Sequence, residues 1–373
     1  MKISDLIDYS TDEYKWDIIE TIPEFARLKE CEQNPHWHSE GNAWNHTVAV
    51  CKMAQKYILE ANRAEEKYSQ ILLAAALFHD IGKGVTTEFI KGNWHSYGHE
   101  IKSEIITRRL LWDEDVTIRE YICSLVRWHM EPLRIFQSKN YISKIIELSG
   151  KVCDLHLLCL LKRFDILGSD CKDKEGQKYD MYQIGEIEML LQYLNCYNHS
   201  NPSLKFPRLT IERYRIKQKP IIPVYMLIGI SGAGKSTYID KSLGKYPDAV
   251  IISRDIARIA LGYCKEGEKY LGTKEEEEAV TAYCHKLLKD AATDGKTIII
   301  DDMNIKRKYR DSIKEILKEF NTIYHYVYIE ADNIEKNIKR RQNQVPENVL
   351  YKMIESIEWP TYDEYTTFKI ERN

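Results

Sequence analysis

Several features that would assign a class of protein at once are missing from this sequence. The nine cysteines are scattered, and no two of them form a C-x-x-C pair, which argues against a zinc knuckle and against a disulfide framework. No apolar run reaches the ~18 residues that a membrane-spanning helix requires. The first residues are acidic and lack the basic and then apolar layout of a secretory signal. We therefore expect a cytoplasmic protein with reduced thiols and no membrane partner.

An excess of charge of either sign is also missing. The formal net charge is −3, from 54 basic and 57 acidic residues, so there is no overall attraction to nucleic acid. Any polyanion must be held by local basic clusters, such as residues 306–308 (Lys-Arg-Lys) and 339–341 (Lys-Arg-Arg). Such clusters suit weak and transient binding. The charge is thus compatible with a nucleic-acid substrate but does not indicate one.

The hydrophobic periodicity of the sequence changes at a proline-rich stretch. Up to about residue 200, apolar residues recur at spacings of three and four with few β-branched clusters, which predicts helices. Prolines at positions 202, 207, 220 and 223 follow, and proline resists helix continuation. A chain of 373 residues is long enough for two domains. We predict an all-α domain over residues 1–200, a linker over 201–220 and a second domain over 221–373.

The second domain reads as α/β. Short β-rich runs at residues 224–230, 249–253, 297–300 and 322–329 alternate with stretches that are long enough for crossover helices. This alternation predicts a parallel sheet covered by helices. The acidic run Glu275–Glu278 is predicted to be a solvated helix face.

The strongest chemical signal is a phosphate-binding motif. Residues 229–236, Gly-Ile-Ser-Gly-Ala-Gly-Lys-Ser, match G-x-x-x-x-G-K-[ST] in full, between a predicted strand and a predicted helix. The glycines let backbone N–H groups turn toward phosphate oxygens. Lys235 adds positive charge at the β- and γ-phosphates of ATP or another NTP, and Ser236 is placed to ligate Mg²⁺. The predicted ATP-binding residues here are Gly229, Ser231, Gly232, Ala233, Gly234, Lys235, Ser236 and Thr237.

An aspartate and an arginine follow the next predicted strand, in residues 253–258 (Ser-Arg-Asp-Ile-Ala-Arg). Ligands of doubly wound sheets bind beyond the carboxyl ends of the strands, so Asp255 should project into the active cleft. A carboxylate there can accept the proton of an attacking hydroxyl, and Arg258 can hold a phosphate of the acceptor. The alternative for Asp255 is a helix cap at the end of the strand.

Two further segments complete the kinase-like pattern. Residues 301–304, Asp-Asp-Met-Asn, end another buried strand, and their acids can hold Mg²⁺ through water or orient Ser236 and Arg258. Residues 339–341 precede a second predicted helix. An arginine there can close over the transferring phosphoryl group, or the segment can be a solvated basic helix end.

The first domain concentrates histidine. Seven of the eleven histidines lie between His36 and His129. The pair His79-Asp80 ends an apolar helix, where buried polar groups are costly unless something pairs with them, and a divalent metal does so directly. His46, which opens another helix, and Asp165, in an apolar stretch, supply the third and fourth ligands.

The remaining histidines of this region are less specific. His36, His38 and His95 are predicted to be surface or loop residues, although His95 beside Trp94 could touch substrate.

The order of the motifs in the second domain resembles the phage and bacterial polynucleotide 5′-kinases, over about residues 222–373. The resemblance implies that Asp255 is the general base, that Arg258 contacts the acceptor phosphate and that Lys235 acts with them in catalysis. It also implies that Asp302 and Asn304 support the site. Arg340 or Arg341 would be the lid arginine that binds ATP. The segment 339–345 is short and lacks a clearly spaced second arginine, so either of the two fits.

The first domain resembles the HD phosphohydrolase superfamily, whose motif is H…HD…D. His46, His79, Asp80 and Asp165 match this motif, which implies a site for Mn, Fe, Co, Ni or Zn. Residues 44–133 are similar to the HD domain of some bacterial tRNA nucleotidyltransferases, which acts on 2′,3′-cyclic phosphates.

Three further residues extend the resemblance. His99 and His129 match the extra histidines of HD members that hold a second metal, and a protonated phosphate-binding role is the alternative. Lys83 is placed to assist with the anion.

The fusion narrows the choice of function. One module removes phosphate and the other adds it, which converts a 2′,3′-cyclic phosphate and a 5′-hydroxyl into the ends that a ligase requires. The whole chain resembles the bacterial HD-Pnk family of end-healing enzymes. This resemblance implies RNA or DNA strand ends and an NTP as partners, with a ligase acting downstream.

Two other functions remain open at this point. In one, the chain serves nucleotide metabolism or defence, with an HD nucleotide hydrolase and a small-molecule kinase. In the other, it is a nucleotide-sensing partner protein without catalytic activity.

Overall fold

The computed structural model describes residues 1–60, 66–194, 221–243, 246, 248–265, 270, 272–331 and 345–372. The chain divides into two compact units, residues 1–206 and 207–373. The predicted linker, residues 201–220, lies outside the described residues, so its bounds remain a prediction.

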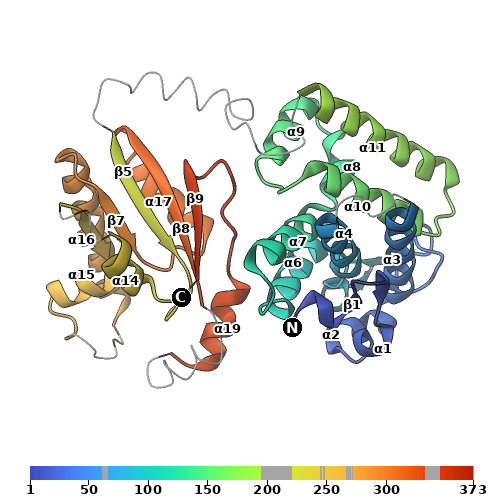
Figure 1. Ribbon diagram of the computed structural model, residues 1–373, viewed down its shortest axis with the longest axis horizontal. Coiled ribbons are helices and arrows are strands. Elements are labelled where there is room, and N and C mark those ends of the chain that lie inside the picture. The colour runs from blue at the N-terminus through green and yellow to red at the C-terminus, as the bar shows by residue number, and fades with distance from the viewer. Residues whose placement is uncertain are drawn as a thin grey trace. The chain divides into compact units, whose positions relative to one another are not determined.

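The first unit is built mainly from helices, as predicted (Figure 1). Two small hairpins, which the sequence did not predict, pair β1 (Ile7–Asp8) with β2 (Glu13–Tyr14) and β3 (Glu88–Ile90) with β4 (Asn93–His95). The helices are η1 (Ile3–Asp5), α1 (Trp16–Ile19), α2 (Pro23–Ala26), η2 (Arg27–Glu30), α3 (Ala43–Glu60), α4 (Glu66–Phe78), α5 (Lys83–Thr86), α6 (His99–Leu110), α7 (Val116–Trp128), α8 (Glu131–Ile135), α9 (Tyr141–Ser149), α10 (Leu155–Gly168) and α11 (Lys174–Leu194).

Helix α4 is the centre of this unit. Every side chain from Ile71 to Phe78 is buried, because the segment is apolar on all sides and such a helix is stable only inside a core. It packs against α3, α7 and α10. The pair His79-Asp80 follows directly, so it is placed inside the core and within reach of side chains from the neighbouring helices.

The second unit contains a parallel sheet of five strands in the order β6-β7-β5-β8-β9, which confirms the predicted α/β class. Its elements are β5 (Ile222–Ile228), α14 (Lys235–Tyr238), η3 (Ile239–Leu243, a π-helical turn), β6 (Val250–Ser253), α15 (Arg254–Ala260), α16 (Lys274–Thr293), β7 (Ile298–Asp301), α17 (Arg307–Ile316), β8 (Thr322–Glu330), α19 (Glu347–Glu355) and β9 (Thr367–Arg372).

The strand order places the predicted kinase motifs together. Strands β5 and β7 are apolar along nearly their whole length, as expected for strands covered on both faces. The chain leaves β5, forms β6 and β7 on one side, and then crosses to form β8 on the other side. The carboxyl ends of β5 and β7 therefore meet at the point where the strand order reverses, where such sheets bind ligands.

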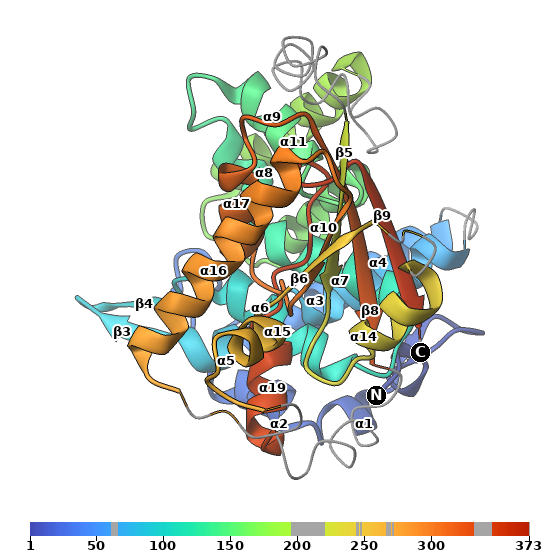
Figure 2. The same cartoon turned by 90° about the vertical axis from the view of Figure 1, so that its left-hand side faces the viewer.

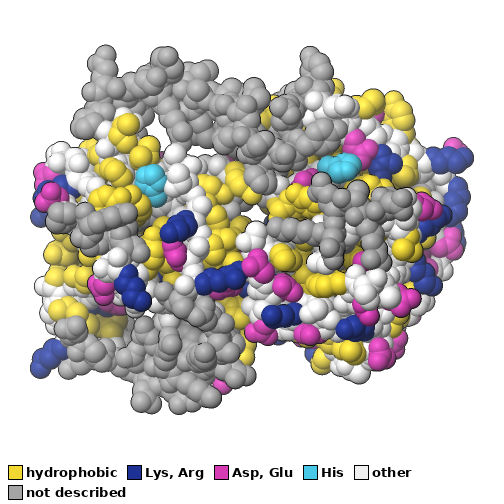
Figure 3. Space-filling view, in the orientation of Figure 1, with side chains coloured by type: hydrophobic (Ala, Val, Ile, Leu, Met, Phe, Trp, Pro, Cys, Tyr) yellow, Lys and Arg dark blue, Asp and Glu magenta, His cyan; other side chains and the backbone are white. Residues whose placement is uncertain are grey.

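Three properties of the described residues bear on the earlier expectations. None of the helices found there has the length and apolar character that crossing a bilayer demands. The eight cysteines in the described ranges are all free. On the face drawn in Figure 3, basic and acidic side chains are interspersed on the described surface of each unit, in keeping with a net charge close to zero.

Candidate metal centre and candidate kinase site

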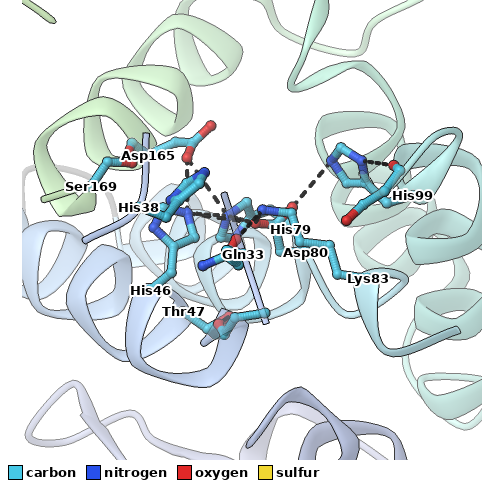
Figure 4. A network of polar contacts seen from close by, with 12 residues as sticks. Gln33, His38, His46, Thr47, His79, Asp80, Lys83, His99, Asp165 and Ser169 are labelled. Atoms are coloured by element: carbon cyan, nitrogen blue, oxygen red, sulfur yellow. Dashed lines mark hydrogen bonds and ion pairs between the residues drawn. The ribbon is translucent and has the colours of Figure 1, made fainter. Parts of the chain in front are cut away.

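The four predicted HD ligands converge on one place inside the first unit (Figure 4). His46 comes from α3 and Asp165 from α10, while His79 and Asp80 follow α4. His46 Nε2 lies 3.0 Å from Asp165 Oδ1 and 3.4 Å from His79 Nε2. His79 Nε2 lies 3.2 Å from Asp80 Oδ2. All four side chains are buried.

The two extra histidines join a second group on the other side of Asp80. His99 begins α6 and His129 follows α7. His99 Nε2 lies 3.2 Å from Asp80 Oδ1 and 3.3 Å from His129 Nε2. The two oxygens of Asp80 are thus divided between the groups, with Oδ2 facing His79 and Oδ1 facing His99. Asp80 Oδ1 has no hydrogen-bond partner among the described residues.

The hydrogen bonds of the histidine rings show which nitrogens are available. Nδ1 of His79, His99 and His129 lies 2.9, 2.8 and 2.7 Å from the backbone carbonyl three residues earlier. A carbonyl can only accept, so each Nδ1 carries a proton, and a ring that releases its other proton to bind a metal presents a lone pair at Nε2. Burial and the neighbouring His99 hold the pKa of His129 well below its ordinary value. The Nε2 atoms of His46 and His79 lie 3.4 Å apart, and those of His99 and His129 lie 3.3 Å apart. If both nitrogens of such a pair present lone pairs, they repel one another unless a cation lies between them.

The donor set therefore fits one or two divalent transition metals. Neutral imidazoles and carboxylates are ligands for Mn, Fe, Co, Ni or Zn. Within each of two groups, His46–His79–Asp165 and Asp80–His99–His129, the ligand atoms lie within 4.8 Å of one another. Burial raises the pKa of Asp80, but His79 and Lys83 outweigh this effect and lower it well below its ordinary value. The carboxylate is thus ionised, as a metal ligand must be.

Two buried lysines hold the carboxylates of this centre. Lys83 Nζ lies 2.7 Å from Asp80 Oδ2 and 2.7 Å from Gln33 Oε1. Lys162 Nζ lies 2.6 Å from Asp165 Oδ2. Lys83 was predicted to assist with an anion, and it does lie at the centre. Lys162 was missed, although its spacing of three residues from Asp165 on one helix was a usable signal.

Glu40 and His38 were also missed. Glu40 Oε1 accepts hydrogen bonds from Nδ1 of both His46 and His38, at 3.0 and 2.8 Å. His38 lies in a loop, as predicted, but its half-buried ring packs edge-on against His46 with the ring centroids 4.7 Å apart, a contact that was not predicted. Both residues lie before α3 in a segment without hydrophobic periodicity, so the sequence contained no signal for this contact.

In the second unit, the phosphate-binding loop joins β5 to α14. Gly232 and Gly234 adopt φ angles of 79° and 98°, which residues with a Cβ rarely adopt. A Cβ on Gly229 would lie 2.6 Å from the carbonyl oxygen of Ile329 on the neighbouring strand β8. Lys235 Nζ lies 3.0 Å from the carbonyl oxygens of both Gly229 and Ile230. The ammonium group is therefore at the loop, where the phosphates of a nucleotide would lie.

The two acids at the end of β7 have different positions. Ser236 Oγ donates to Asp301 Oδ2 at 3.2 Å, and burial raises the pKa of Asp301. Asp302 accepts the backbone N–H of Met303 at 2.7 Å, and its support of the site stays a prediction. The structure thus points to Asp301 as the acid beside the predicted Mg²⁺ ligand.

Asn304 ties the end of β7 to β5. Its buried Nδ2 donates to the backbone carbonyl of Leu227 at 2.8 Å. The carbonyl of the preceding residue, Met303, accepts the backbone N–H of Gly229 at 3.0 Å. Asn304 is therefore placed to hold the first residue of the phosphate-binding loop against the sheet.

Asp255 lies in the first turn of α15, with its side chain 89% exposed. It does not cap that helix, whose N-cap is Ser253. Asp255 Oδ1 accepts from Arg258 Nη1 at 2.6 Å, and Arg258 Nε donates to Glu277 Oε1 at 2.9 Å. The carboxylate is thus open to an acceptor hydroxyl and oriented by an arginine.

Glu277 corrects part of the prediction for the acidic run. The run was expected to be a solvated face, but Glu277 forms ion pairs with both Arg254 and Arg258. Burial lowers the pKa of Arg258, but the ion pair with Glu277 outweighs this effect, so the pKa lies above its ordinary value. Glu277 therefore fixes the two arginines of the Ser-Arg-Asp-x-x-Arg motif. The predicted lid arginines, Arg340 and Arg341, lie outside the described residues.

A cavity of about 940 Å³ lies beside this site. Arg254, Glu277 and Asp302 line it, together with Lys306 and Lys308 of the predicted basic cluster. Its other walls come from α16, α17, α19 and the ends of β6 and β7. Neither the phosphate-binding loop nor Asp255 is among the described residues that line it.

Comparison with known proteins finds one family match in each of the two units. Residues 43–168 match the HD domain family, and residues 224–360 match a family described as AAA domain, here a P-loop kinase domain. The chain joins an HD domain to a P-loop kinase domain. This order fits the HD-Pnk arrangement and confirms the resemblance at the level of the two domains.

Three curated relatives match parts of the chain. The L-seryl-tRNA(Sec) kinase of Methanococcus maripaludis is 28% identical over 142 residues, which are 36% of this chain and 52% of that protein. The multifunctional CCA protein of Actinobacillus pleuropneumoniae is 40% identical over 89 residues, which are 24% of this chain and 20% of that protein. A protein of Autographa californica nuclear polyhedrosis virus that carries the name bifunctional polynucleotide kinase/RNA ligase is 32% identical over 130 residues, 31% and 18% of the two chains. The chain thus spans about half, or less, of the length of these relatives.

Proposed function

We propose that this protein heals broken nucleic-acid strands with two active sites. The HD site removes 2′,3′-cyclic, 2′- or 3′-phosphates, and the P-loop site transfers the γ-phosphate of an NTP to a 5′-hydroxyl. One observation carries the proposal: a buried metal-ligand set and a kinase site with an accessible aspartate lie in the same chain. Together they perform the removal and the addition of phosphate that a ligase requires of its substrates.

In the HD site, His46, His79, Asp80 and Asp165 would hold a first metal, and Asp80, His99 and His129 a second. Metals held there would supply a bound water of lowered pKa and neutralise phosphate charge. The chain itself orients the ligands, through backbone carbonyls for three rings and through Glu40 for His46. Lys83 lies at the edge of the ligand set, where its ammonium group can move from Asp80 to a phosphate oxygen of the substrate.

In the kinase site, Lys235 would bind the β- and γ-phosphates, and Ser236 with Asp301 would hold Mg²⁺. The exposed carboxylate of Asp255 would accept the proton of the 5′-hydroxyl as it attacks the γ-phosphate. Arg258 orients that carboxylate and can also contact the acceptor phosphate. We propose Arg340 or Arg341 as the lid, on the resemblance alone.

Three features support a polynucleotide acceptor. The names of two relatives refer to RNA: one is an L-seryl-tRNA(Sec) kinase, and the other is named a polynucleotide kinase/RNA ligase. The cavity beside Arg254 is large enough for more than a hydroxyl group, and Lys306, Lys308 and Lys352 on its wall suit backbone phosphates. The order of the domains fits the HD-Pnk arrangement.

One experiment tests the proposal as a whole. Purified protein is incubated with an oligonucleotide that carries 5′-hydroxyl and 2′,3′-cyclic phosphate ends, with labelled ATP, Mg²⁺ and in turn Mn²⁺, Co²⁺, Ni²⁺, Fe²⁺ or Zn²⁺. We expect label at the 5′ end and a free hydroxyl at the 3′ end. A free nucleoside is offered in parallel as the control acceptor. Transfer of label to the nucleoside alone would rule out end healing and favour a role in nucleotide metabolism.

A further inference from the structure

The β3–β4 hairpin is attached directly to the candidate metal centre. It connects α5, which begins at Lys83, with α6, which begins at His99. Ser96, just after β4, places its carbonyl oxygen 2.8 Å from Nδ1 of His99 and its hydroxyl 2.7 Å from that of Thr87. The base of the hairpin therefore holds one of the metal-ligand rings.

Large aromatic side chains on this hairpin and just after it are partly or largely exposed. Phe89 and Trp94 face each other across the two strands with ring centroids 5.0 Å apart. His95 and Tyr97 stack with their centroids 5.1 Å apart and their planes 10° from parallel. Phe89 is 60% exposed and Tyr97 is 74% exposed. Figure 2 shows the hairpin extending away from α5 and α6.

A second segment, which contacts the hairpin, carries another exposed aromatic side chain. In the loop before α3, Trp37 is 50% exposed and packs edge-on against His36. The same loop contacts the hairpin through Asn34 and Asn93, whose side chains lie 3.5 Å apart, and contacts Lys83 through Gln33. We use the name aromatic rim for the five side chains Trp37, Phe89, Trp94, His95 and Tyr97.

The packing of the first unit does not account for the rim. None of its five side chains belongs to the buried core of the unit. A two-stranded hairpin is at best marginally stable by itself, and exposed clusters of large apolar side chains mark binding sites. Lys91, in the hairpin turn, and Lys172, whose backbone N–H donates to the carbonyl of His36 at 3.2 Å, are exposed beside it. Open aromatic faces with nearby cations suit an unpaired nucleic-acid strand.

We propose that the aromatic rim binds unpaired bases of a single strand whose 3′-terminal phosphate lies in the HD site. The inference rests on the proposed function and adds to it that the HD site takes an unpaired strand rather than free nucleotides. Tyr97 is two residues from His99, so their Cα atoms are at most about 7 Å apart. A base next to the terminal nucleotide therefore lies within reach of the stacked pair His95–Tyr97.

The direct test is binding of a single-stranded RNA octamer that carries fluorescein at its 5′ end and a phosphate at its 3′ end, followed by fluorescence anisotropy with the full chain. We expect Tyr97→Ala and Phe89→Ala each to weaken binding about tenfold or more, because a base stacked on an aromatic ring contributes ~1–3 kcal/mol. Tyr182→Ala is the matched control, since Tyr182 is 61% exposed on α11. Unchanged binding by both rim variants would overturn the inference.

A second probe separates stacking from other effects of the substitutions. It has the same backbone and 3′-phosphate but lacks the bases of the three nucleotides before the 3′ end. Wild-type protein should bind this probe about tenfold less tightly than the complete octamer, while Tyr97→Ala should distinguish the two probes much less. Equal affinity of the wild type for both probes would also refute base stacking.

Measurements of phosphate release show whether the inference about the aromatic rim or the proposed function itself is wrong. Phosphate release is measured from the octamer and from a nucleoside 3′-phosphate, with Mn²⁺ or Co²⁺ present. Tyr97→Ala should raise KM for the octamer about tenfold and affect the mononucleotide less. If wild-type protein releases phosphate from neither substrate, the proposed function fails, whereas the anisotropy results still decide whether the rim binds bases.

Discussion

Glu40 lies 3.0 Å from Nδ1 of His46, although it belongs to no helix of the HD unit. Its other carboxylate oxygen accepts the backbone N–H of Asp170 at 3.0 Å, so the side chain is held between two loops. Burial raises the pKa of Glu40, but the hydrogen bonds from His38 and His46 outweigh this and lower it. An ionised carboxylate on Nδ1 orients an imidazole and makes its Nε2 a stronger metal donor.

The first prediction is that Glu40→Gln weakens metal binding by about 10- to 100-fold, because the amide loses the charge and its NH2 group cannot accept the backbone N–H of Asp170. Affinity for Zn²⁺ or Co²⁺ is measured in the full chain by competition with a chromogenic chelator. Glu60→Gln, on the exposed end of α3, is the control. Wild-type affinity in Glu40→Gln would show that the contact has no effect on the centre.

The second prediction is that the two activities separate by single substitutions. Asp80→Ala removes the carboxylate that faces both groups of metal-ligand residues, so phosphate release should be lost while 5′-phosphorylation persists. Asp255→Ala should do the reverse and lower the kinase rate about 10²–10⁴-fold. Both activities are assayed on one doubly modified oligonucleotide. An Asp255→Ala protein with full kinase activity would favour a nucleotide-sensing role over a catalytic one.

The third prediction concerns the adjacent acids at the end of β7. Because Asp301 and not Asp302 contacts Ser236, Asp301→Asn should raise the Mg²⁺ concentration needed for half-maximal kinase activity about tenfold or more. Asp302→Asn is the matched comparison and should have a smaller effect. Mg²⁺ titrations at saturating ATP measure the difference. Equal effects of the two substitutions would contradict this assignment.

The sequence predicted the parts of the fold and site that depend on local patterns. The second half of helix α4, residues 71–78, is apolar all round, and the strands β5 and β7 are apolar runs, so their burial could be read directly. Strand β9 has no apolar run of the kind that identified the buried strands. Thr-Phe-Lys-Ile-Glu-Arg alternates in polarity, as a half-exposed edge strand does, and the prediction did not use this signal. The phosphate-binding motif was found because all its parts are contiguous.

Contacts between distant segments were beyond the sequence. Glu40 and Asp170 are 130 residues apart, and nothing in either segment specifies that they meet. The choice between Asp301 and Asp302 depends on which way two successive side chains point at the end of a strand. The aromatic rim likewise needs the loop at Trp37 to contact the hairpin, a contact that no motif records.

A network of buried ion pairs in the first unit predicts how the stability of that unit depends on pH. Glu120 on α7 accepts hydrogen bonds from Arg108 on α6 at 2.8 to 3.0 Å and from its neighbour Arg119 at 2.9 Å. All three side chains are buried. Burial raises the pKa of Glu120, but Arg108 and Arg119 outweigh it, so the pKa in the folded protein is below the ordinary value. Glu120 is therefore a stabilising group only while it is ionised.

The sign of the pH dependence follows from that direction. A carboxyl group with a lowered pKa in the folded state stabilises it fully above the unfolded value of about 4.3, and the stabilisation is lost as the pH falls through the folded value. Glu120→Gln should lower the free energy of unfolding at pH 7 by about 3–5 kcal/mol, because two buried guanidinium groups lose their partner. The difference from wild type should shrink below pH 4. Urea unfolding followed by tryptophan fluorescence reports mainly on this unit, since six of the seven tryptophans precede residue 129. A difference that stays constant from pH 7 to pH 3 would mean that folding does not lower the pKa of Glu120.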